Sequence, residues 1–294
     1  MQAVPDHFEH PLDAAEFKRP ARAGIELYRA RIVHHAFDPH THEAFGLGAI
    51  ESGVERFRYR GGDHLAPPDT LVLMNPDELH TGRAETEHGW RYRMLYLDAE
   101  LLTQVTGERG WHFAQPTVHD VRTARRVGRL LAAMWNAPDA LAIDSALVDL
   151  LEMLRPHAHT GTTRSASAIT RPDAALARVH ALIQARYAEP LTLEQLAHEA
   201  GLSPFHFLRR FKQRYHVTPH QMVMAVRLFR AKQQLAAGVS PAHVAADVGL
   251  VDQPHLTRRF ARMYGVTPAR YQAQVNRRNC VQDRCRRPEP HSAA

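Results

Sequence analysis

The stretch Leu196-Ala-His-Glu-Ala-Gly-Leu-Ser-Pro-Phe-His-Phe-Leu-Arg-Arg-Phe211 decides the fold of the C-terminal half, because it returns as Val244-Ala-Ala-Asp-Val-Gly-Leu-Val-Asp-Gln-Pro-His-Leu-Thr-Arg-Arg-Phe260. In both copies an Ala stands four residues before a Gly, and the copy ends on Arg-Arg-Phe. A Tyr and then a Pro follow that Phe at steps of four and four. Agreement at so many positions indicates that one structural unit occurs twice.

Each copy has the local chemistry of two helices joined by a tight turn. In the first copy, Thr192 is placed to cap a helix that ends at Gly201, where a positive φ is needed. Ser203 then caps a second helix that has Pro204 at its first position. Core stripes at helical spacing are expected at Phe207, Phe211 and Tyr215, and at Leu256, Phe260 and Tyr264. The pattern predicts two helix-turn-helix units.

The face of each second helix that points away from its core is cationic and polar. Guanidinium, amide and hydroxyl groups presented in this way suit phosphates and the base edges of the major groove. We therefore predict DNA contacts at Phe205, His206, Leu208, Arg209, Arg210, Lys212, Gln213, Gln253, Pro254, His255, Thr257, Arg258 and Arg259.

The charges are distributed unevenly along the chain. The chain has 37 Lys and Arg against 31 Asp and Glu. Residues 171–294 hold 19 of the basic and 8 of the acidic residues, a net charge of +11, which leaves −5 for residues 1–170. Such asymmetry favours a polyanionic partner for the C-terminal half. Between the two units, residues 219–237 read as a long joining helix, with Arg227, Arg230 and Lys232 off its apolar face. A rigid joint would set recognition helices about 34 Å apart, in successive major grooves.

Residues 173–275 closely resemble the DNA-binding domain of the AraC/XylS family of bacterial transcription regulators. The Ala-x-x-x-Gly-Leu-Ser opening, the two Phe positions and the Val266-Thr-Pro-Ala-Arg-Tyr271 ending carry the likeness. By this resemblance the base-reading residues are Phe205, Leu208 and Arg209 in the first unit, and Gln253, Pro254 and Thr257 in the second. Leu208 and Pro254 depart from the polar residues often found there, so only apolar contact with a thymine methyl is expected from them.

The resemblance also implies partners. It implies a regulator, taken here as an activator, that binds double-stranded promoter or operator DNA, acts beside RNA polymerase, forms a homodimer and responds to a small-molecule effector. The position of the operator relative to the promoter decides between activation and repression. The identity of the effector, the operator and the target genes are not encoded in any pattern of this sequence.

Residues 1–120 are predicted to form a cupin-like β-barrel. Short runs rich in β-formers, broken by turn residues, occur at 24–33, 45–50, 55–59, 70–74 and 91–97. In the last of these, Trp90, Tyr92, Met94 and Tyr96 share one face, while Leu95 and Leu97 make the other face apolar. This strand is expected to pack on both sides at one end.

Two amphipathic helices are predicted over 121–157, and they either form a dimer seam or cover their own barrel. A flexible linker at 158–172 and a disordered basic tail at 276–294 complete the chain. The fold class is therefore two-domain α+β: a cupin-like barrel with two following helices, then an all-α domain of two helix-turn-helix units joined by a long helix.

Histidines in the N-terminal half mark a candidate sensor site. His40-Thr-His42, with His80 about forty residues on, resembles the metal motif of cupins. Metal-binding cupins normally place a Glu four to five residues after the second His; here Gly46-Leu47 stands there, and Glu43 is expected on the opposite strand face. An organic ligand in the barrel mouth is therefore the favoured prediction, with no metal and no cofactor. Its expected lining residues are His40, His42, His80, Trp90 and Tyr92, with Arg58 and Arg93 as candidate carboxylate partners. Plain structural histidines are the next alternative, and metal binding is the least favoured.

Other classes are disfavoured by composition. No apolar run approaches the roughly 18 residues of a membrane helix, and the first 22 residues lack the apolar segment of a secretory signal. The two cysteines, Cys280 and Cys285, lie in the Arg-rich tail, so no disulfide framework is expected. We expect a folded protein of the bacterial cytoplasm, associated with the nucleoid and not with a membrane.

Two functions remain. The first is a ligand-responsive transcription factor, in which the sensor biases two flexibly linked halves or two subunits. The second is a metal-dependent cupin enzyme fused to a DNA-binding domain, which predicts tightly bound metal and turnover. The missing Glu, and the absence of a nucleophile–base pair or phosphate loop from the sequence, favour the first.

Overall fold

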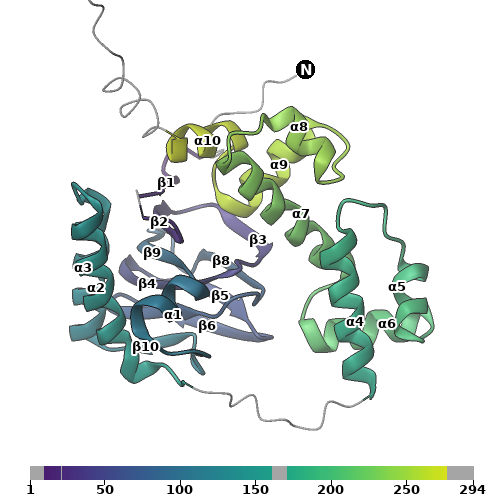
Figure 1. The fold of residues 1–294 in the computed structure, drawn as a ribbon, viewed down its shortest axis with the longest axis horizontal. Helices are drawn as coiled ribbons and strands as arrows, with labels where there is room; N and C mark the ends of the chain where they lie inside the picture. The colour runs from purple at the N-terminus through teal and green to yellow at the C-terminus, as the bar shows by residue number, and fades with distance from the viewer. Residues whose placement is uncertain (1–9, 21, 161–170, 277–294) are drawn as a thin grey trace, which may run out of the picture.

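The computed structural model describes residues 10–20, 22–160 and 171–276, and it shows a β-rich N-terminal domain followed by a helical domain (Figure 1). This architecture confirms the predicted two-domain α+β fold class. Most of the expected linker and all but the first residue of the expected tail, with Cys280 and Cys285, lie outside the described residues. Within the described part, no helix combines the length and the apolar character needed to cross a membrane.

The N-terminal domain is built on two antiparallel sheets that share a core. Their strands are β1 (Ala14–Lys18), β2 (Ile25–Ile32), β3 (Ala36–His40), β4 (Ala44–Gly53), β5 (Glu55–Tyr59), β6 (Gly62–Ala66), β7 (Thr70–Met74), β8 (His80–Ala84), β9 (Trp90–Asp98) and β10 (Thr117–His119). One sheet has the order β1-β2-β9-β4-β7-β10 and the other β3-β8-β5-β6. The five predicted strands are present, and β1, β3, β6, β8 and β10 are additional.

Strand β9 separates two layers of apolar side chains. Trp90, Tyr92 and Met94 point into the core between the sheets. Leu95 and Leu97 are fully buried in a second core on the outer face of the larger sheet. The prediction that this strand packs on both sides is therefore confirmed, and the reason is that helices cover its outer face.

Those helices are α1 (Ala99–Thr106), α2 (Val121–Asn136) and α3 (Ala140–Leu154), followed by the 3₁₀ turn η1 (Arg155–His157). The Asp120 and Asp139 carboxylates cap α2 and α3 by accepting backbone N–H groups. Of the two roles considered for the pair, covering the barrel is the one seen within this chain (Figure 1). Helix α3 still leaves Leu141 and Val148 exposed, at 75% and 46%.

The C-terminal domain holds helices α4 (Arg171–Arg186), α5 (Leu193–Ala200), α6 (Pro204–Tyr215), α7 (Pro219–Ala236), α8 (Pro241–Asp247), α9 (Gln253–Tyr264) and α10 (Pro268–Asn276). Helices α5 and α6 form the first helix-turn-helix unit, and α4 and the start of α7 complete its own core around Phe207 and Phe211. Helices α8 and α9 form the second unit. Its core, around Leu256 and Phe260, is continuous with the core of the barrel.

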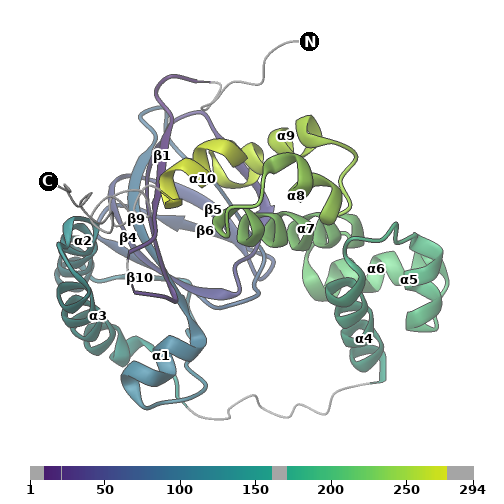
Figure 2. The ribbon, with the colours of Figure 1, turned by 45° about the horizontal axis from the view of Figure 1, so that its top comes forward.

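The second unit is packed on the barrel, with α7, α9 and α10 lying over the strands (Figure 2). The Lys232 ammonium forms a buried ion pair with Glu26 of β2, and the Tyr271 hydroxyl donates to the same carboxylate at 2.7 Å. Arg19 completes the set at 3.2 Å. Two flexibly linked halves were expected, and Lys232 was expected off the apolar face of its helix. That expectation for Lys232 was wrong, because helical periodicity carries no information about a second domain that covers the helix.

The joining helix α7 also ties the two units together. Arg227 donates from its guanidinium to three backbone carbonyls: Tyr187 at 2.6 Å, Glu189 at 2.8 Å and Gly249 at 2.8 Å. Tyr187 and Glu189 follow α4, next to the first unit, while Gly249 is the turn of the second. A planar cation with five N–H groups is suited to hold several carbonyls at once.

Candidate effector and DNA-binding sites

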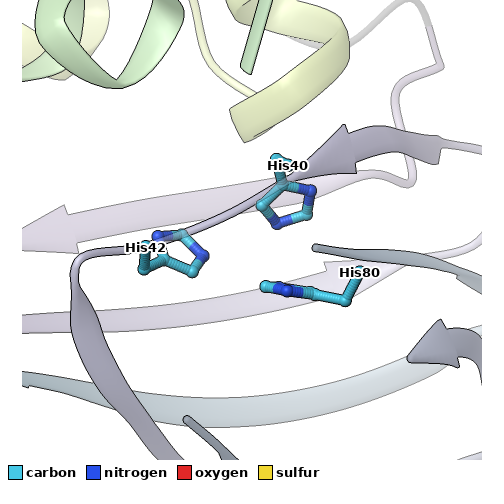
Figure 3. Close-up of side chains that lie close together, drawn as sticks. All are labelled: His40, His42 and His80. Carbon is cyan, nitrogen blue, oxygen red and sulfur yellow. The ribbon is translucent and has the colours of Figure 1, made fainter. Parts of the chain in front are cut away.

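Three histidines meet at one end of the barrel, directly below the second helix-turn-helix unit (Figure 3). His40 ends β3 and pairs in register with His80, which begins β8. His42 follows in the connection to β4. The ring centroids lie 4.2 Å apart for His40 and His80, 5.2 Å for His40 and His42, and 5.3 Å for His42 and His80. Figure 3 shows the three rings turned toward one another.

Hydrogen bonds fix which ring nitrogens face the cluster. Nδ1 of His40 lies 2.8 Å from the Asp38 carbonyl, and Nδ1 of His80 lies 3.0 Å from the Glu78 carbonyl. A carbonyl only accepts, so Nδ1 carries the proton in both rings and Nε2 keeps its lone pair. Nε2 of His42 is buried without a hydrogen-bond partner. Burial, reinforced by the neighbouring rings, holds the pKa of His40 and of His42 well below its ordinary value.

The histidines line a small space at one end of the barrel, next to α9. Its volume is about 40 Å³, close to that of a single water molecule and far below the roughly 300 Å³ of the smallest drug-sized pockets. Tyr92 lines it, and its role in binding a ligand stays a prediction. Trp90 does not; it is buried between Phe37 and Tyr92.

Two further residues of this space were not predicted from the sequence. Glu55 faces it from β5, and burial raises the pKa of this carboxyl to about 8. Tyr264 faces it from α9, and its hydroxyl is buried without a partner. The sequence offered a signal for Glu55, since a strand of alternating pattern places it on the same face as Phe57 and Tyr59. No local signal places Tyr264, because it belongs to the other domain.

Other charged groups considered for ligand binding point elsewhere. Arg58 is exposed and lies 3.7 Å from Asp63, and Arg93 is paired with Glu51, a residue of the neighbouring strand β4. Neither lines the histidine cavity. Glu43 was expected on the opposite face of a strand; it lies in the connection before β4, where it pairs with Arg230 of α7 at 3.1 Å.

A second, larger cavity of about 530 Å³ lies between the barrel and α7. Its walls are mostly polar and include both members of the buried ion pair, Glu26 and Lys232. His42 lines this cavity as well as the small one. The side chain of His42 is therefore a wall of both spaces.

The recognition helices α6 and α9 are built as the sequence predicts. The Thr192 side chain forms a capping box with Gln195, Gly201 takes φ 66°, and the Ser203 side chain caps α6 with Pro204 at its start. In the second unit Gly249 takes φ 74°, and Asp252 caps α9 by accepting the His255 N–H at 2.6 Å. A side chain at Gly249 would also collide with the Ala188 carbonyl. Both the positive φ and this close contact therefore favour Gly at this position.

The side chains proposed to meet DNA lie on the open sides of these helices. Phe205 is 79% exposed, although an aromatic ring of that size is normally buried. Also exposed are His206, Arg209, Arg210, Lys212, Gln213, Gln253, Pro254 and Arg258. Leu208, His255, Thr257 and Arg259 are half-buried. Arg262, on the flank of α9, is taken up by the barrel through a 3.1 Å pair with Asp38.

This combination of a β-barrel with a buried site and two capped, cationic recognition helices defines a ligand-binding regulator of the double helix-turn-helix class. Residues 22–151 match the AraC-like ligand binding domain, and residues 196–274 match a helix-turn-helix domain family. The probable transcriptional regulator LumQ of Photobacterium leiognathi is 34% identical over 267 residues, which cover 87% of this chain and 98% of LumQ. YbfI of Bacillus subtilis, described as an HTH-type transcriptional regulator, is 27% identical over 79% of this chain and 86% of its own.

Solved structures agree on the fold. An apo ToxT variant from Vibrio cholerae superposes with a TM-score of 0.55 at 8% identity, over 87% of this chain and 100% of ToxT. The chain belongs to the AraC/XylS family of transcriptional regulators. It is an AraC-like regulator with an N-terminal ligand-binding domain and a helix-turn-helix DNA-binding domain.

Proposed function

We propose that the protein is an effector-responsive regulator in which the contents of the barrel control the second helix-turn-helix unit. One observation carries this proposal: Met263 and Tyr264, at the end of recognition helix α9, line the same cavity as His40, His42 and His80. An occupant of that cavity touches the sensor and the DNA-binding domain together. It therefore has different contacts in the packed and released arrangements, which is the requirement for shifting an equilibrium between them.

A small molecule is the effector class that the two cavities support. The larger space beside Lys232 has room for an organic molecule, and it opens onto His42. A structure of ToxT, similar in fold, is described as bound to an unsaturated fatty acid, at a TM-score of 0.52 and 10% identity over 87% of this chain and 98% of ToxT. This supports a small-molecule effector and leaves its identity to experiment.

The DNA-bound form is proposed to read bases through Phe205, Leu208 and Arg209 of α6, and through Gln253, Pro254 and Thr257 of α9. The remaining cationic residues of both helices would hold phosphates. Support comes from their exposure and from the net charge of +11 in residues 171–294. The Thr257 hydroxyl already donates to the Gln253 carbonyl at 2.9 Å, so its methyl group is the free part.

Further partners follow from the same picture. We propose a homodimer that uses the α2–α3 surface around Leu141 and Val148, which are large apolar side chains left exposed there. In a dimer on two half-sites, binding of the first chain would raise the effective concentration of the second at its half-site, so the dimer would bind DNA more tightly than one chain. RNA polymerase is the proposed target of the DNA-bound dimer, in the bacterial cytoplasm and at the nucleoid.

Regulation rather than catalysis is proposed for the barrel. The curated relatives compared above are transcriptional regulators, which supports this assignment. A metal-dependent cupin enzyme would instead show turnover of a substrate.

The proposal is tested by selecting bound sequences from a random duplex DNA pool with the full-length protein. A shared motif should emerge, and Arg209→Ala should weaken binding to it by about 1–3 kcal/mol and relax one base position. Arg83→Ala, which removes an exposed cation of β8 away from both the recognition helices and the α2–α3 surface, is the matched control and should bind as the wild type does. Absence of any enriched sequence, or equal loss in both variants, would overturn the proposal.

A further inference from the structure

The histidine cluster has an excess of acceptors. His40 and His80 each spend their ring proton on a backbone carbonyl two residues earlier, so their Nε2 lone pairs point into the cluster. Nε2 of His42 is buried there without a partner. One donor nitrogen from each ring can be chosen so that all three lie within 4.8 Å of one another. Lone pairs gathered in an apolar space require a cation or a proton donor between them.

The surroundings suit a cation better than an organic group. The space holds about 40 Å³, enough for an ion with a water molecule. The carbonyl partners of His40 and His80 also match the arrangement around metal-binding histidines, in which the second ring nitrogen donates to a carbonyl or carboxylate and so fixes the ring. Glu55 adds a buried carboxyl to the same space, and this carboxyl balances the charge of a cation once it has given up its proton.

We propose that His40, His42 and His80 bind one divalent transition-metal ion. Three imidazole nitrogens select Zn²⁺, Co²⁺, Ni²⁺, Cu²⁺ or Fe²⁺ and discriminate against Mg²⁺ and Ca²⁺, which prefer oxygen. Ligation at about 2.1 Å in a tetrahedron sets donors about 3.4 Å apart, so the rings draw together slightly on binding. A fourth position remains for water.

This inference changes the interpretation of the sequence. The Glu that metal-binding cupins carry after the second His is replaced here by Gly46-Leu47, and that replacement argued against a metal. The structure shows that the three histidines converge without it. Three protein ligands plus a water are a sufficient set for zinc.

The second helix-turn-helix unit lies next to the three histidines. The Tyr264 ring centroid is 6.2 Å from that of His40 and 6.5 Å from that of His42, and its hydroxyl is buried and unpartnered. A water on the metal is a ready hydrogen-bond partner for this hydroxyl. We therefore assign the metal a role as a signal that changes the affinity of the regulator for DNA. This role rests on the proposed function, whereas the metal site itself does not.

The site is tested on full-length protein carrying Cys280→Ser and Cys285→Ser, so that the tail thiols do not contribute. Metal is first removed with a chelator, and bound Zn²⁺ is then measured by equilibrium dialysis. This protein should bind one more equivalent of Zn²⁺ per chain than each of three variants made in it: His40→Gln, His42→Gln and His80→Gln. His88→Gln, an exposed histidine of the same domain, is the matched control and should retain the full amount. Equal Zn²⁺ uptake by the control and all three variants would overturn the site.

Co²⁺ binding to the wild-type background provides a measurement that does not depend on the variants folding. A four-coordinate site gives strong visible absorption, whereas adventitious six-coordinate Co²⁺ absorbs weakly. Saturation of a strong band at one equivalent, reversed by Zn²⁺ but not by Mg²⁺, supports the site. A weak band that rises without saturation contradicts it.

Regulation is tested separately, by measuring affinity for the selected DNA with and without Zn²⁺. The affinity should change in the wild type and in His88→Gln, and should stay constant in His80→Gln. Tyr264→Phe should keep the bound Zn²⁺ and lose most of the change. If Zn²⁺ binds but DNA affinity is the same in all proteins, the site stands and its role as an input is wrong; if no DNA is selected, the dialysis result still decides the site.

Discussion

The two helix-turn-helix units have nearly the same sequence pattern and very different surroundings. The first keeps a core of its own around Phe207 and Phe211, and Leu79 of the barrel packs against the edge of that core. The second shares its core with the barrel, and its recognition helix closes the histidine cavity. The repeated motif therefore occurs once with a core of its own and once with a core that it shares with the barrel.

Truncation of equivalent core residues should reveal the largest difference between the two units. Phe211→Ala and Phe260→Ala should each cost about 3–5 kcal/mol, because both rings are fully buried. All three tryptophans, Trp90, Trp111 and Trp135, lie in the N-terminal domain and report on its unfolding. In urea, the fluorescence midpoint should fall clearly in Phe260→Ala and little in Phe211→Ala. Equal shifts would show that the barrel does not distinguish the two units.

Breaking the buried ion pair should detach the second unit alone. Lys232→Met leaves Glu26 buried with only Arg19 and Tyr271 as partners, at a cost of about 3 kcal/mol. The double variant Glu26→Gln/Lys232→Met should regain most of that loss, since neither buried charge remains; Arg19 loses its carboxylate partner but is partly exposed to water. Urea titrations of the three proteins measure both effects. A double variant no better than the single one would show that packing of the Lys232 stem, and not charge, holds the contact.

Acidification should act on the same pair and less strongly. Burial pushes the pKa of Glu26 up, but Lys232 and Arg19 more than offset this, so the folded-state pKa lies below its ordinary value of 4.5. The unfolded chain thus takes up the proton first. The stabilisation is complete above about pH 4.5 and is lost as the pH falls through the lowered pKa. The free energy of unfolding should be measured from about pH 6 to about pH 3, which spans the ordinary pKa of a glutamate. It should fall more steeply with decreasing pH in the wild type than in Lys232→Met.

The exposed pair at the edge of the contact should have the smallest effect. Arg262 of α9 is largely exposed where it meets Asp38, so Asp38→Asn should cost only about 0.2–1 kcal/mol. Hydrogen exchange should quicken slightly in α9 and stay unchanged in α6. Asp63→Asn, which removes the exposed partner of Arg58 away from this contact, is the control. Faster exchange in both helices would mean that the pair steadies the whole domain.

The helical half was predictable because its signals are local. Thr192, Ser203 and Gly201 mark helix ends within a few residues of the groups they satisfy, and the repeat doubles each signal. The barrel was predictable only where strands carry continuous apolar runs. Strand β3 reads Ala-Phe-Asp-Pro-His and β8 reads His-Thr-Gly-Arg-Ala, so their identity depends on pairing with distant strands.

The candidate site was only partly predictable for the same reason. His40, His42 and His80 could be named from their spacing, but their convergence depends on the register between β3 and β8. Tyr264 was expected as part of a core stripe, and it is buried as expected. That it also forms the lid of another domain's cavity follows only from the tertiary packing. Lys232 was misplaced because burial of a cation requires a partner 206 residues away.

Arg227 has a consequence for the operator. Its guanidinium holds carbonyls beside both units, so the two recognition helices are presented at a set separation. Because this separation is fixed, the two DNA segments must lie on the same side of the duplex. Adding about five base pairs, half a helical turn, between them would move the second segment to the opposite side. Inserting a full turn of about ten would restore the side but stretch the gap beyond reach of one chain, leaving only one unit engaged.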